Sequence, residues 1–399
     1  MLPVADALAR IIAAVQPSHI RSEVVPLAAC ANRVLAQDLT AKRTQPPFDV
    51  SSMDGFALRS GDTPGKPLRL IGESAAGSPF AGEIGPGEAV RIYTGAKIPV
   101  GADCVLLQER ADVERDTLTS EIALVPGTFI RKAGLDFAKG EALLSRGTRL
   151  VPAKLALAAA MDYPELNVAQ RPRIALIATG DELAEPGSNA TGEAIIASNL
   201  YGIAAMIEAE GGEAIDLGIA RDTPESLEAA FRAAMMTGAD CLVTIGGASV
   251  GRHDLVRPVA KSLGARLDFF KVAMRPGKPL NFGVLGDMLL LGLPGNPVSA
   301  MVCATLFLRP LVRALQGDRD ASVDRSEPAR LASALPTNDE RQDYLRAALH
   351  FDAQGAVANP LDRQDSSLLT RLAAADVLII RPPHASAAIA GDWVRILRL

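Results

Sequence analysis

The stretch IALIATGDEL, at residues 174–183, decides the fold of this chain. Its first five residues are apolar and aliphatic, which is typical of a buried parallel strand. The strand ends at a polar turn, Thr179-Gly180-Asp181-Glu182. In open α/β sheets, ligands bind beyond the carboxyl ends of the strands, so a polar turn at this point predicts part of a binding site.

The sequence on the carboxyl side of this strand continues to alternate between strands and helices. Further buried strands are predicted at Ile215–Ile219, Cys241–Ile245 and Leu289–Leu291. Helices are predicted from Ser198 to Glu210, from Thr223-Pro224 to about Gly238, from Asp254 to Leu263, and from Asn296-Pro297 to about Leu315. Hydroxyl, amide and proline residues at these starts are typical helix caps. We therefore predict a doubly wound α/β domain over residues 171–320.

Outside residues 171–320 the pattern of apolar and turn-forming residues is different, which indicates additional domains. Residues 43–130 contain short apolar runs separated by glycine and proline, which indicates an inserted β-rich domain. Residues 1–42 and 131–170 flank this insertion, and each carries one short helix, at 3–15 and 152–161. We expect the two helices to pack against each other. Residues 321–399 become β-rich again.

Composition excludes several classes of partner. The chain of 399 residues has a net charge of −5 and only 4% aromatic residues, so no basic stripe or stacking platform for nucleic acid is expected. No run of about 18 uncharged apolar residues is present, so we expect no membrane span. The four cysteines are scattered within apolar runs, which favours core packing, a reducing compartment and hence a cytoplasmic location.

The glycine-rich loop 246–251 follows the strand that ends at Ile245. Gly246, Gly247 and Gly251 would allow close approach of a phosphate to backbone N–H groups, and Ser249 would add a hydroxyl. The loop matches neither the dinucleotide-binding motif nor the Walker lysine motif. A tight strand-to-helix turn without a ligand is the alternative.

Two cations bracket a Pro-Gly turn further along. Arg275 and Lys278 lie on one short loop stiffened by prolines, which would make a preorganised oxyanion site or else a solvated basic turn. Asn296-Pro297, which follows Pro294, would add free amides at a helix start, although an ordinary helix start is equally compatible.

Three carboxylates follow strand ends of the same predicted sheet. Glu182, Asp222 and Asp254 should therefore meet at one rim. Carboxylates beside phosphate-binding amides are typical of a bridging Mg²⁺ ion, which prefers oxygen ligands. For Asp222, an ordinary acidic residue at a helix start is the alternative.

The β-rich region contains two dense polar patches. One is 48–57, centred on Ser51-Ser52-Met53-Asp54-Gly55, and the other is 93–103, which begins Tyr93-Thr94-Gly95. Such patches would either complete the site of another subunit or form plain turns.

Taken together, six ordered motifs resemble the molybdopterin molybdotransferase family, the MoeA type whose relatives include the gephyrin E domain. They are PPFDVSSMDGFAL at 46–58, YTGAKIPVGADCV at 93–105, ATGDEL at 178–183, GGASVGRHD at 246–254, RPGKP at 275–279 and GLPGNPVSAMV at 292–302. The resemblance implies an elongated N-terminal region, a molybdopterin-binding α/β domain and a small C-terminal β-barrel at 321–399. It also implies a homodimer in which the β-rich domain of one subunit reaches the α/β domain of the other.

The resemblance further implies the reaction and its residues. Adenylylated molybdopterin and molybdate would give molybdenum cofactor and AMP, assisted by Mg²⁺. Carried over by position, the catalytic set is Asp54, Glu182, Asp222, Asp254 and Lys278, and the metal set is Glu182, Asp222 and Asp254. The binding set is Thr94, Gly246, Gly247, Ser249, Gly251, Arg275, Lys278, Pro294, Pro297 and Ser299, with Arg131, Asp136, Arg346 and Ser366 at more peripheral positions.

The sequence departs from the family pattern at two positions: Arg275 stands where lysine is common, and Arg252 follows Gly251 where an acid is common. Arginine can bind an oxyanion through two hydrogen bonds, so binding should be preserved, and the choice between molybdate and tungstate stays open. A molybdopterin adenylyltransferase, which shares the α/β fold, and a non-catalytic pterin-binding scaffold are the rival functions. Protein partners implied by the resemblance are the adenylyltransferase itself and apo-molybdoenzymes.

Overall fold

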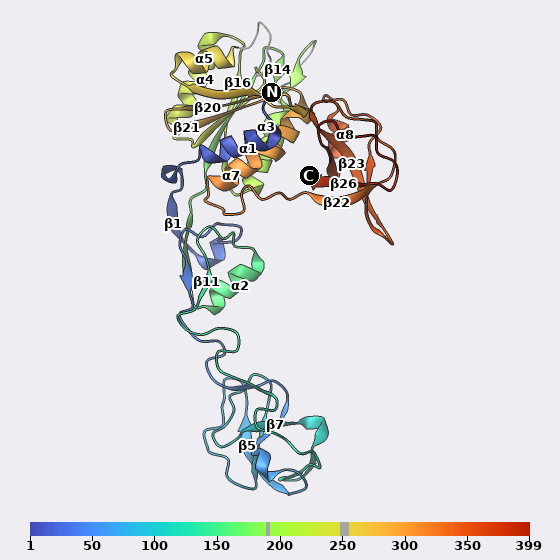
Figure 1. Cartoon of the computed structure of the whole chain (residues 1–399). Helices are drawn as coiled ribbons and strands as arrows, with labels where there is room; N and C mark the ends of the chain where they lie inside the picture. The colour runs from blue at the N-terminus through green and yellow to red at the C-terminus, as the bar shows by residue number, and fades with distance from the viewer. Residues whose placement is uncertain (189–191, 248–254) are drawn as a thin grey trace.

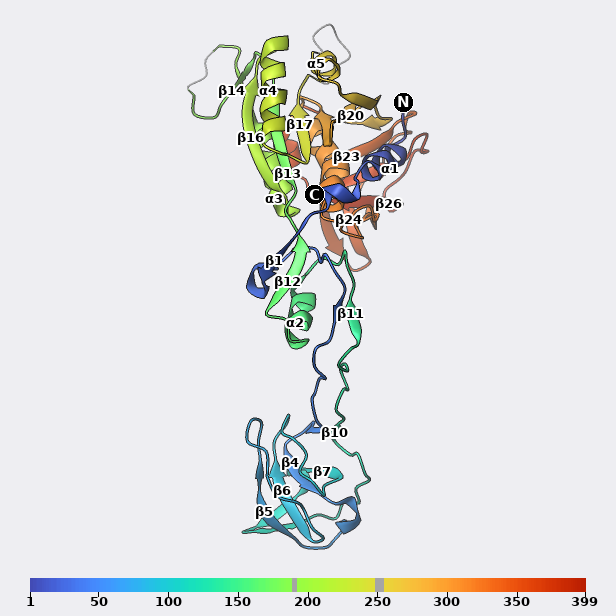
Figure 2. The same ribbon diagram turned by 90° about the vertical axis from the view of Figure 1, so that its left-hand side faces the viewer.

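The computed structural model describes residues 1–188, 192–247 and 255–399, and these form an elongated molecule. The α/β domain and the C-terminal β domain lie side by side at one end, and a thin stem leads to a separate β-rich lobe at the other (Figure 1). The chain passes along the stem twice, once before and once after the lobe (Figure 2). The lobe is therefore an insertion within the stem.

The α/β domain is built on a six-stranded sheet with the order β16-β13-β17-β21-β20-β18. The first four strands in this order are parallel, and the last two are antiparallel additions at one edge. The strands are β13 (Arg173–Thr179), β16 (Glu213–Ala220), β17 (Cys241–Ile245), β18 (Arg266–Lys271), β20 (Pro279–Leu285) and β21 (Met288–Leu293). A separate parallel pair, β14 (Leu183–Ala184) and β15 (Ile195–Ile196), lies beside the sheet.

Helices cover both faces of this sheet, so the predicted doubly wound α/β fold is confirmed. One face packs on α3 and the continuous segment α6–η5–α7, and the other packs on α4 and α5. The bounds are α3 (Ser198–Ala209), α4 (Pro224–Met236), α5 (Val256–Ser262), α6 (Pro297–Cys303), the π-helix η5 (Ala304–Leu308) and α7 (Arg309–Ala314). The predicted cap of α4 is present, since the Thr223 hydroxyl accepts from the Ser226 N–H at 3.2 Å.

One expectation about this domain was wrong, and two of its strands were not predicted. Helix α1 (Val4–Ala13) does not pack on α2 (Pro152–Ala160); its buried residues Ala7 and Ile11 join the core of the α/β domain against α7. The sequence also failed to predict the β18 and β20 strands, because their antiparallel addition does not alternate with helices.

The stem is a set of short strand pairs around α2. Strand β1 (Ser22–Pro26) pairs with β12 (Glu165–Ala169), and β2 (Leu39–Thr40) pairs with β11 (Ala142–Leu144). These segments share a small apolar core that includes Leu39, Leu144, Met161 and Val168. Near the lobe, β3 (Val50–Ser51) pairs with β10 (Ile130–Arg131).

The lobe contains a six-stranded sheet with the order β7-β4-β6-β5-β9-β8. Its strands are β4 (Gly55–Leu58), β5 (Leu68–Ser74), β6 (Glu88–Ile92), β7 (Cys104–Leu107), β8 (Asp112–Glu114) and β9 (Thr117–Thr119). Apolar residues pack on both faces of this sheet, in two separate clusters. The predicted β-rich character of this region is confirmed.

The C-terminal domain is a closed small barrel, as predicted. Strands β23, β24, β22, β26 and β25 pair in that order, and β25 pairs back with β23. Their bounds are β22 (Glu327–Leu331), β23 (Gln342–Asp352), β24 (Gly355–Pro360), β25 (Val377–Arg381) and β26 (Trp393–Arg398), with helix α8 at Leu369–Ala373. Closure of the barrel leaves its apolar core, including Ala347 and Ile379, fully buried.

The segment Pro297–Ala314 is long and apolar enough to cross a membrane by length and composition alone. However, 72% of it is buried inside the protein, where it forms the α6–η5–α7 element of the α/β core. The burial is the property expected of a core helix.

Candidate functional site

A cleft of about 720 Å³ opens at the carboxyl ends of the parallel strands of the α/β domain. Residues directly after β13, β16, β17 and β21 line it, which is where the topology of an open α/β sheet predicts a ligand site. The start of α3 and Ser367 of the C-terminal domain complete the wall. Of the predicted site residues, the cleft brings together Glu182, Asp222, Gly246, Gly247, Pro294, Pro297 and Ser299.

Glu182 and Asp222 supply two carboxylates to this cleft. Glu182 is exposed, and its carboxylate folds back over Gly180, where an added Cβ would lie only 2.6 Å from Glu182 Oε2. Asp222 lies just before α4, and its backbone N–H donates to Asp181 Oδ1 at 3.2 Å. Gly180 is thus needed for the position of the Glu182 carboxylate.

The two carboxylates fit the needs of a hard divalent cation. Mg²⁺ is commonly held by one or two carboxylates together with substrate phosphate oxygens and water. Among the described residues, no group of three or more histidine, cysteine or acidic side chains converges. The third predicted ligand, Asp254, lies outside the described residues, as do Ser249 and Gly251.

Gly246 and Gly247 form the floor of the cleft, and both have positive φ, at 97° and 60°. An added Cβ at Gly246 would lie 2.6 Å from the Thr179 carbonyl oxygen, and one at Gly247 would lie 2.4 Å from Val256 Cγ2. Only glycine fits this turn, because a side chain would face both a disfavoured backbone conformation and a clash. Such a turn can present backbone N–H groups to an anion.

Thr179 is a cleft residue that the predicted site set did not include. Its side chain is 4% exposed, and its hydroxyl has no hydrogen-bond partner in the described part of the chain. Buried hydroxyls are normally paired, so an unpaired one beside Gly246 and Gly247 indicates a ligand or water contact. Its position immediately after a buried strand was the signal that could have identified it.

The Pro294–Pro297 turn is fixed from two sides. The Asn199 side chain of α3 donates to the Gly295 carbonyl at 2.8 Å, and the Asn296 side chain donates to the Ser366 hydroxyl at 3.1 Å. The Val298 N–H also donates to the Ser366 carbonyl at 3.0 Å. Ser366 therefore lies against the turn that shapes the cleft, and the C-terminal domain contributes directly to its wall.

The two cations of the 275–279 loop, Arg275 and Lys278, differ in their surroundings. Pro279 lines the cleft, and the exposed Lys278 directly precedes it in the chain without lining the cleft itself. Lys278 has no ion-pair partner among the described residues. Arg275, in contrast, forms ion pairs with Asp339 and Asp343 of the C-terminal domain. Arg275 is therefore not a solvated basic residue, because carboxylates of the C-terminal domain pair with it, and an oxyanion site at Arg275 and Lys278 stays a prediction.

Asp54 and Thr94 lie in the lobe, far from the cleft of the same chain (Figure 2). They form one feature, because the Thr94 backbone N–H donates to Asp54 Oδ1 at 2.7 Å. This hydrogen bond holds the pKa of Asp54 below its usual value. Both residues are exposed.

The peripheral candidates are dispersed. Arg131 and Asp136 are exposed on the stem near the lobe. Arg346, on β23 inside the barrel, is only 1% exposed and donates to the Asp365 carbonyl at 3.2 Å. Burial lowers the pKa of its guanidinium, and its Nε has no partner among the described residues.

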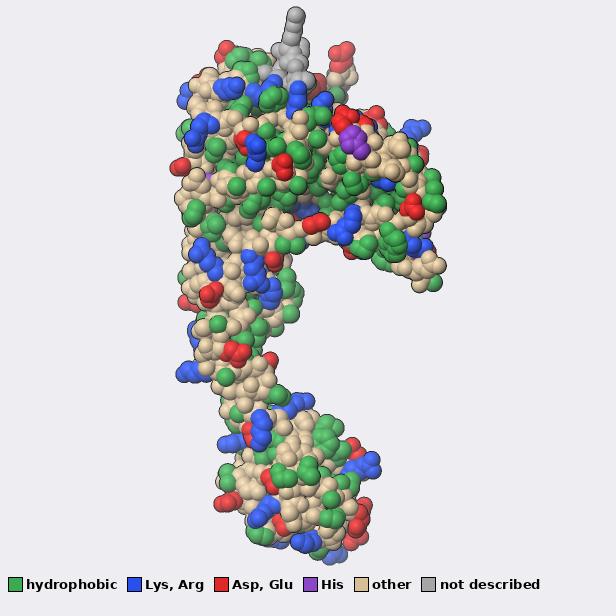
Figure 3. All heavy atoms as spheres, viewed as in Figure 1, with side chains coloured by type: hydrophobic (Ala, Val, Ile, Leu, Met, Phe, Trp, Pro, Cys, Tyr) green, Lys and Arg blue, Asp and Glu red, His purple; other side chains and the backbone are tan. Residues whose placement is uncertain are grey.

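Acidic and basic side chains are interspersed over the face of the molecule seen in Figure 3, on the upper domains, the stem and the lobe alike. These features define a class of protein. It is a multidomain α/β protein whose cleft lies at the carboxyl ends of the parallel strands, where open α/β sheets bind ligands, and is lined by carboxylates and a glycine turn that can accept an anion. The lobe and the C-terminal barrel are appended to this α/β unit rather than built into its sheet.

Comparison with known proteins places the chain in a family. Family models match at residues 2–161 (MoeA N-terminal region, domain I and II), 175–314 (“Probable molybdopterin binding domain”) and 328–399 (MoeA C-terminal region, domain IV). The molybdopterin molybdenumtransferase of Haemophilus influenzae is 34% identical over 383 residues, covering 95% of this chain and 94% of that protein. The Bacillus subtilis molybdopterin molybdenumtransferase is 35% identical, with coverage of 94% and 89%.

Solved structures agree with the sequence relatives. A MoeA protein of molybdopterin biosynthesis from Pyrococcus horikoshii OT3 matches with a TM-score of 0.86 at 26% identity, over 100% of both chains. Another solved MoeA protein of molybdopterin biosynthesis, also from Pyrococcus horikoshii, matches with a TM-score of 0.80 at 30% identity, over 100% of this chain and 99% of that one. The chain belongs to the MoeA family, and the resemblance inferred from its motifs is confirmed.

Proposed function

We propose that this chain is a molybdopterin molybdenumtransferase, which inserts molybdenum from molybdate into adenylylated molybdopterin and releases AMP. The observation that carries this proposal is the cleft at the strand ends, with two carboxylates, a glycine turn and a lysine around it. The substrate carries a diphosphate and a dithiolate, and molybdate is a dianion. Binding them calls for cationic and backbone groups for the anions, together with carboxylates that can hold a bridging cation. The names of the full-length relatives support the same activity.

The diphosphate of the substrate would lie over Gly246 and Gly247. The absence of side chains lets a ligand approach the backbone of this turn closely, although the Gly246 N–H is already used in a hydrogen bond to the Leu293 carbonyl at 3.0 Å. The Thr179 hydroxyl beside the turn lacks a partner among the described residues. Pro294, Pro297 and the buried Ser299 give the opposite wall its shape. Ser249 and Gly251 belong to the same proposed loop.

Glu182 and Asp222, together with Asp254, would hold a Mg²⁺ ion. When bound, that ion would neutralise charge on the diphosphate. The support is the presence of two of these carboxylates on one cleft and the preference of Mg²⁺ for oxygen ligands.

Lys278 is the proposed molybdate ligand of the rim. It is an exposed cation without an ion-pair partner among the described residues, and its neighbour Pro279 lines the cleft. All four cysteines are free thiols that are buried, so none is in a position to act as a nucleophile. The residues would therefore act by positioning two anions and stabilising their charge, rather than by covalent catalysis.

Asp54 and Thr94 are proposed to act on the cleft of a second subunit. They form a fixed polar pair at the surface of the lobe, yet the stem holds this lobe far from the cleft of its own chain. A homodimer that places one lobe beside the partner's α/β domain would give the pair a role. Arg131 and Asp136, on the stem, would face the same junction.

Two rival functions are less well supported. An adenylyltransferase of this fold would not need the stem, lobe and barrel, which the transferase relatives share over at least 89% of their length. A scaffold without activity would not need two carboxylates lining one cleft and, next to it, a lysine that has no ion-pair partner among the described residues. A cytoplasmic location, with transient contacts to the adenylyltransferase and apo-molybdoenzymes, belongs to the same proposal and is compatible with the four free thiols.

The test is single-turnover release of AMP from adenylylated molybdopterin, with excess enzyme, in the presence and absence of molybdate and Mg²⁺. The proposal requires fast AMP release only when molybdate is present. AMP release that is independent of molybdate, or ATP-dependent adenylylation of free molybdopterin, would contradict it. Glu182→Gln and Asp222→Asn should both suppress the reaction while the circular dichroism spectrum is retained.

A further inference from the structure

The loop that carries Lys278 is physically part of two domains. Its first residues form strand β19 (Met274–Arg275), which pairs in parallel with β23 of the barrel, so that Arg275 lies opposite Asp343. The Gln342 N–H also donates to the Ala273 carbonyl at 2.9 Å. A two-residue piece of the α/β domain thus extends the sheet of the C-terminal domain.

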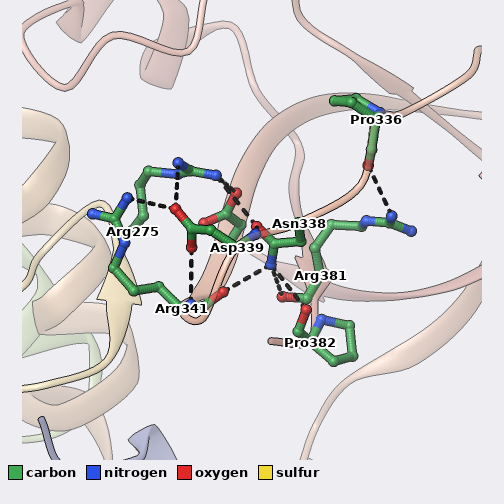
Figure 4. Close-up of polar contacts among 8 residues, drawn as sticks. Arg275, Pro336, Asn338, Asp339, Arg341, Arg381 and Pro382 are labelled. Carbon is green, nitrogen blue, oxygen red and sulfur yellow. Dashed lines mark hydrogen bonds and ion pairs between the residues drawn. The ribbon is translucent and has the colours of Figure 1, made fainter. Parts of the chain in front are cut away.

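Side chains reinforce this junction at Arg275. Its guanidinium forms ion pairs with Asp343 and, at 3.1 Å, with Asp339, and it donates to the Asn338 side-chain oxygen at 3.3 Å (Figure 4). Asp343 is only 4% exposed; its Oδ2 pairs with Arg275, and its Oδ1 has no hydrogen-bond partner among the described residues. Buried carboxylates need a cation, and Arg275 supplies it.

The acceptor side of the junction is fixed independently of Arg275. Asp339 accepts the Arg341 guanidinium at 2.7 Å and the Arg341 backbone N–H at 2.9 Å. The Asn338 side chain donates to the carbonyls of Arg341, Arg381 and Pro382 at 2.7–3.1 Å (Figure 4). The Arg341 contacts bring the pKa of Asp339 to about 2, so the carboxylate is ionised throughout the physiological range.

Arg275 and Lys278 lie close together on the same loop, so the contacts that hold Arg275 also restrict the position of Lys278. Only Pro276 and Gly277 separate them, and an added Cβ at Gly277 would lie 2.4 Å from Cys303 Sγ of α6. The Lys278 carbonyl accepts the Val272 N–H at 3.0 Å. Because only two residues separate Arg275 from Lys278, loss of the anchor at Arg275 would leave the backbone hydrogen bond from Val272 as a remaining contact that holds the Lys278 end of the loop.

We propose that Asp339 and Asp343 are positioning residues, which clamp Arg275 from the C-terminal barrel and thereby hold Lys278 at the cleft rim for oxyanion binding. This inference rests on the proposed function, because that function assigns the oxyanion to Lys278. It gives the barrel a role in the reaction without placing it in contact with the pterin. It also gives Arg275 a role distinct from that of an anion ligand.

The experiment uses the full-length Asp343→Asn and Asp339→Asn variants, which are nearly isosteric, and their double variant. Asp352→Asn is the matched control, because Asp352 pairs with Arg330 on the same barrel but away from this junction. Single-turnover AMP release is titrated with molybdate. The junction variants should need about tenfold more molybdate for half-maximal release, and the control should match the wild type.

Two further measurements make the result specific. In a Lys278→Gln background, the junction substitutions should have no additional effect on the molybdate titration, because the residue that they position is absent. Hydrogen exchange in the 272–279 segment should be faster in the junction variants and unchanged in Asp352→Asn. Should Asp343→Asn fail to fold, Asp339→Asn carries the same three measurements.

Several outcomes would overturn the inference. These are an unchanged molybdate titration with unchanged exchange in folded junction variants, full additivity with Lys278→Gln, or a larger effect of Arg275→Gln than of the double variant. The last result would mean that Arg275 itself contacts the anion. If the wild-type chain shows no molybdate-dependent AMP release, the proposed function fails instead, and the exchange measurement still decides whether the carboxylates hold the loop.

Discussion

The carboxylate of Asp54 and the backbone N–H of Thr94 are joined by a 2.7 Å hydrogen bond across two loops of the lobe. The bond lowers the pKa of Asp54, so an ionised carboxylate is held in a fixed direction at an exposed surface. Two residues that lie 40 positions apart in the sequence therefore form one polar unit. The unit lies in the lobe, far from the cleft of its own chain, which leads to the first prediction (Figure 2).

Mixing two inactive variants should restore activity if lobe and cleft are shared between subunits. Asp54→Ala and Glu182→Ala should each lose activity by at least about a hundredfold. After unfolding and refolding of an equal mixture, heterodimers would contain one intact site, and activity should recover to about a quarter of wild type. AMP release measured before and after mixing checks this expectation.

The control for this mixing is a pair from the same domain. Glu182→Ala mixed with Asp222→Ala should not recover, because both residues line the same cleft and every mixed site lacks one carboxylate. Absence of recovery in the Asp54 and Glu182 mixture, with heterodimers present by native mass spectrometry, would show that the lobe does not act on a partner.

Substitution of Gly246 should damage the cleft floor. Gly246→Ala would place a methyl group 2.6 Å from the Thr179 carbonyl oxygen in a backbone conformation that side chains rarely adopt. We expect a loss of at least about tenfold in AMP release, because the turn must shift. Gly218→Ala is the control, since Gly218 also has positive φ (77°) but an added Cβ there meets nothing within 4 Å. Equal effects of the two substitutions would point to backbone strain alone.

Removal of Asp318 should destabilise the junction between stem and α/β domain. Its side chain, 1% exposed, accepts from Arg149 Nε at 3.0 Å and from Arg313 Nη2 at 2.7 Å. Asp318→Ala would leave both guanidinium groups without this partner, and we expect the free energy of unfolding to fall by about 3–5 kcal/mol. Urea denaturation followed by circular dichroism measures the change, and a loss below about 1 kcal/mol would contradict it.

The same carboxylate predicts a direction of pH dependence. Burial alone would raise the pKa of Asp318, but the Asp320 N–H and the guanidinium groups of Arg149 and Arg313 outweigh it and lower the pKa. A lowered folded-state pKa means that the stabilisation is complete above the unfolded value of about 3.9 and is lost as the pH falls through the folded value. The difference in stability between wild type and Asp318→Ala should therefore shrink only below about pH 4.

The cysteines should be unreactive in the folded protein. Burial raises the pKa of all four thiols, to about 12 for Cys104, and a raised pKa reduces the thiolate fraction at any pH below it. A chromogenic disulfide reagent should thus label the native protein slowly between pH 7 and about 9, and label all four thiols after unfolding in guanidinium. One thiol reacting in the native state at the rate of a free cysteine would contradict this expectation.

The features that depend on local sequence were predicted: a buried strand, the polar turn after it, and the burial of the cysteines. The strand at 174–178 and the following TGDE turn lie where the apolar run and its polar end indicated, and Glu182 lies at the cleft. The cysteines predicted to pack in cores are all buried. The strand-end rule identified the cleft because parallel strands bring their carboxyl ends to one edge.

Long-range pairing was not predictable in the same way. The carboxylate partners of Arg275 lie 64 and 68 residues further along the chain, so the local sequence predicted an oxyanion site or a solvated basic turn and not these ion pairs. The placement of α1 on the α/β core depends on packing between segments far apart in sequence. Nor does periodicity distinguish a wall residue such as Thr179 from an ordinary strand end.

The most direct measurement is the stoichiometry of a single turnover in which AMP released and molybdenum bound to pterin are quantified in the same sample. Wild-type chain with excess molybdate should give equal amounts of the two products, and Lys278→Gln should reduce both together at limiting molybdate. AMP released without molybdenum transferred to the pterin would contradict molybdenum insertion at this cleft.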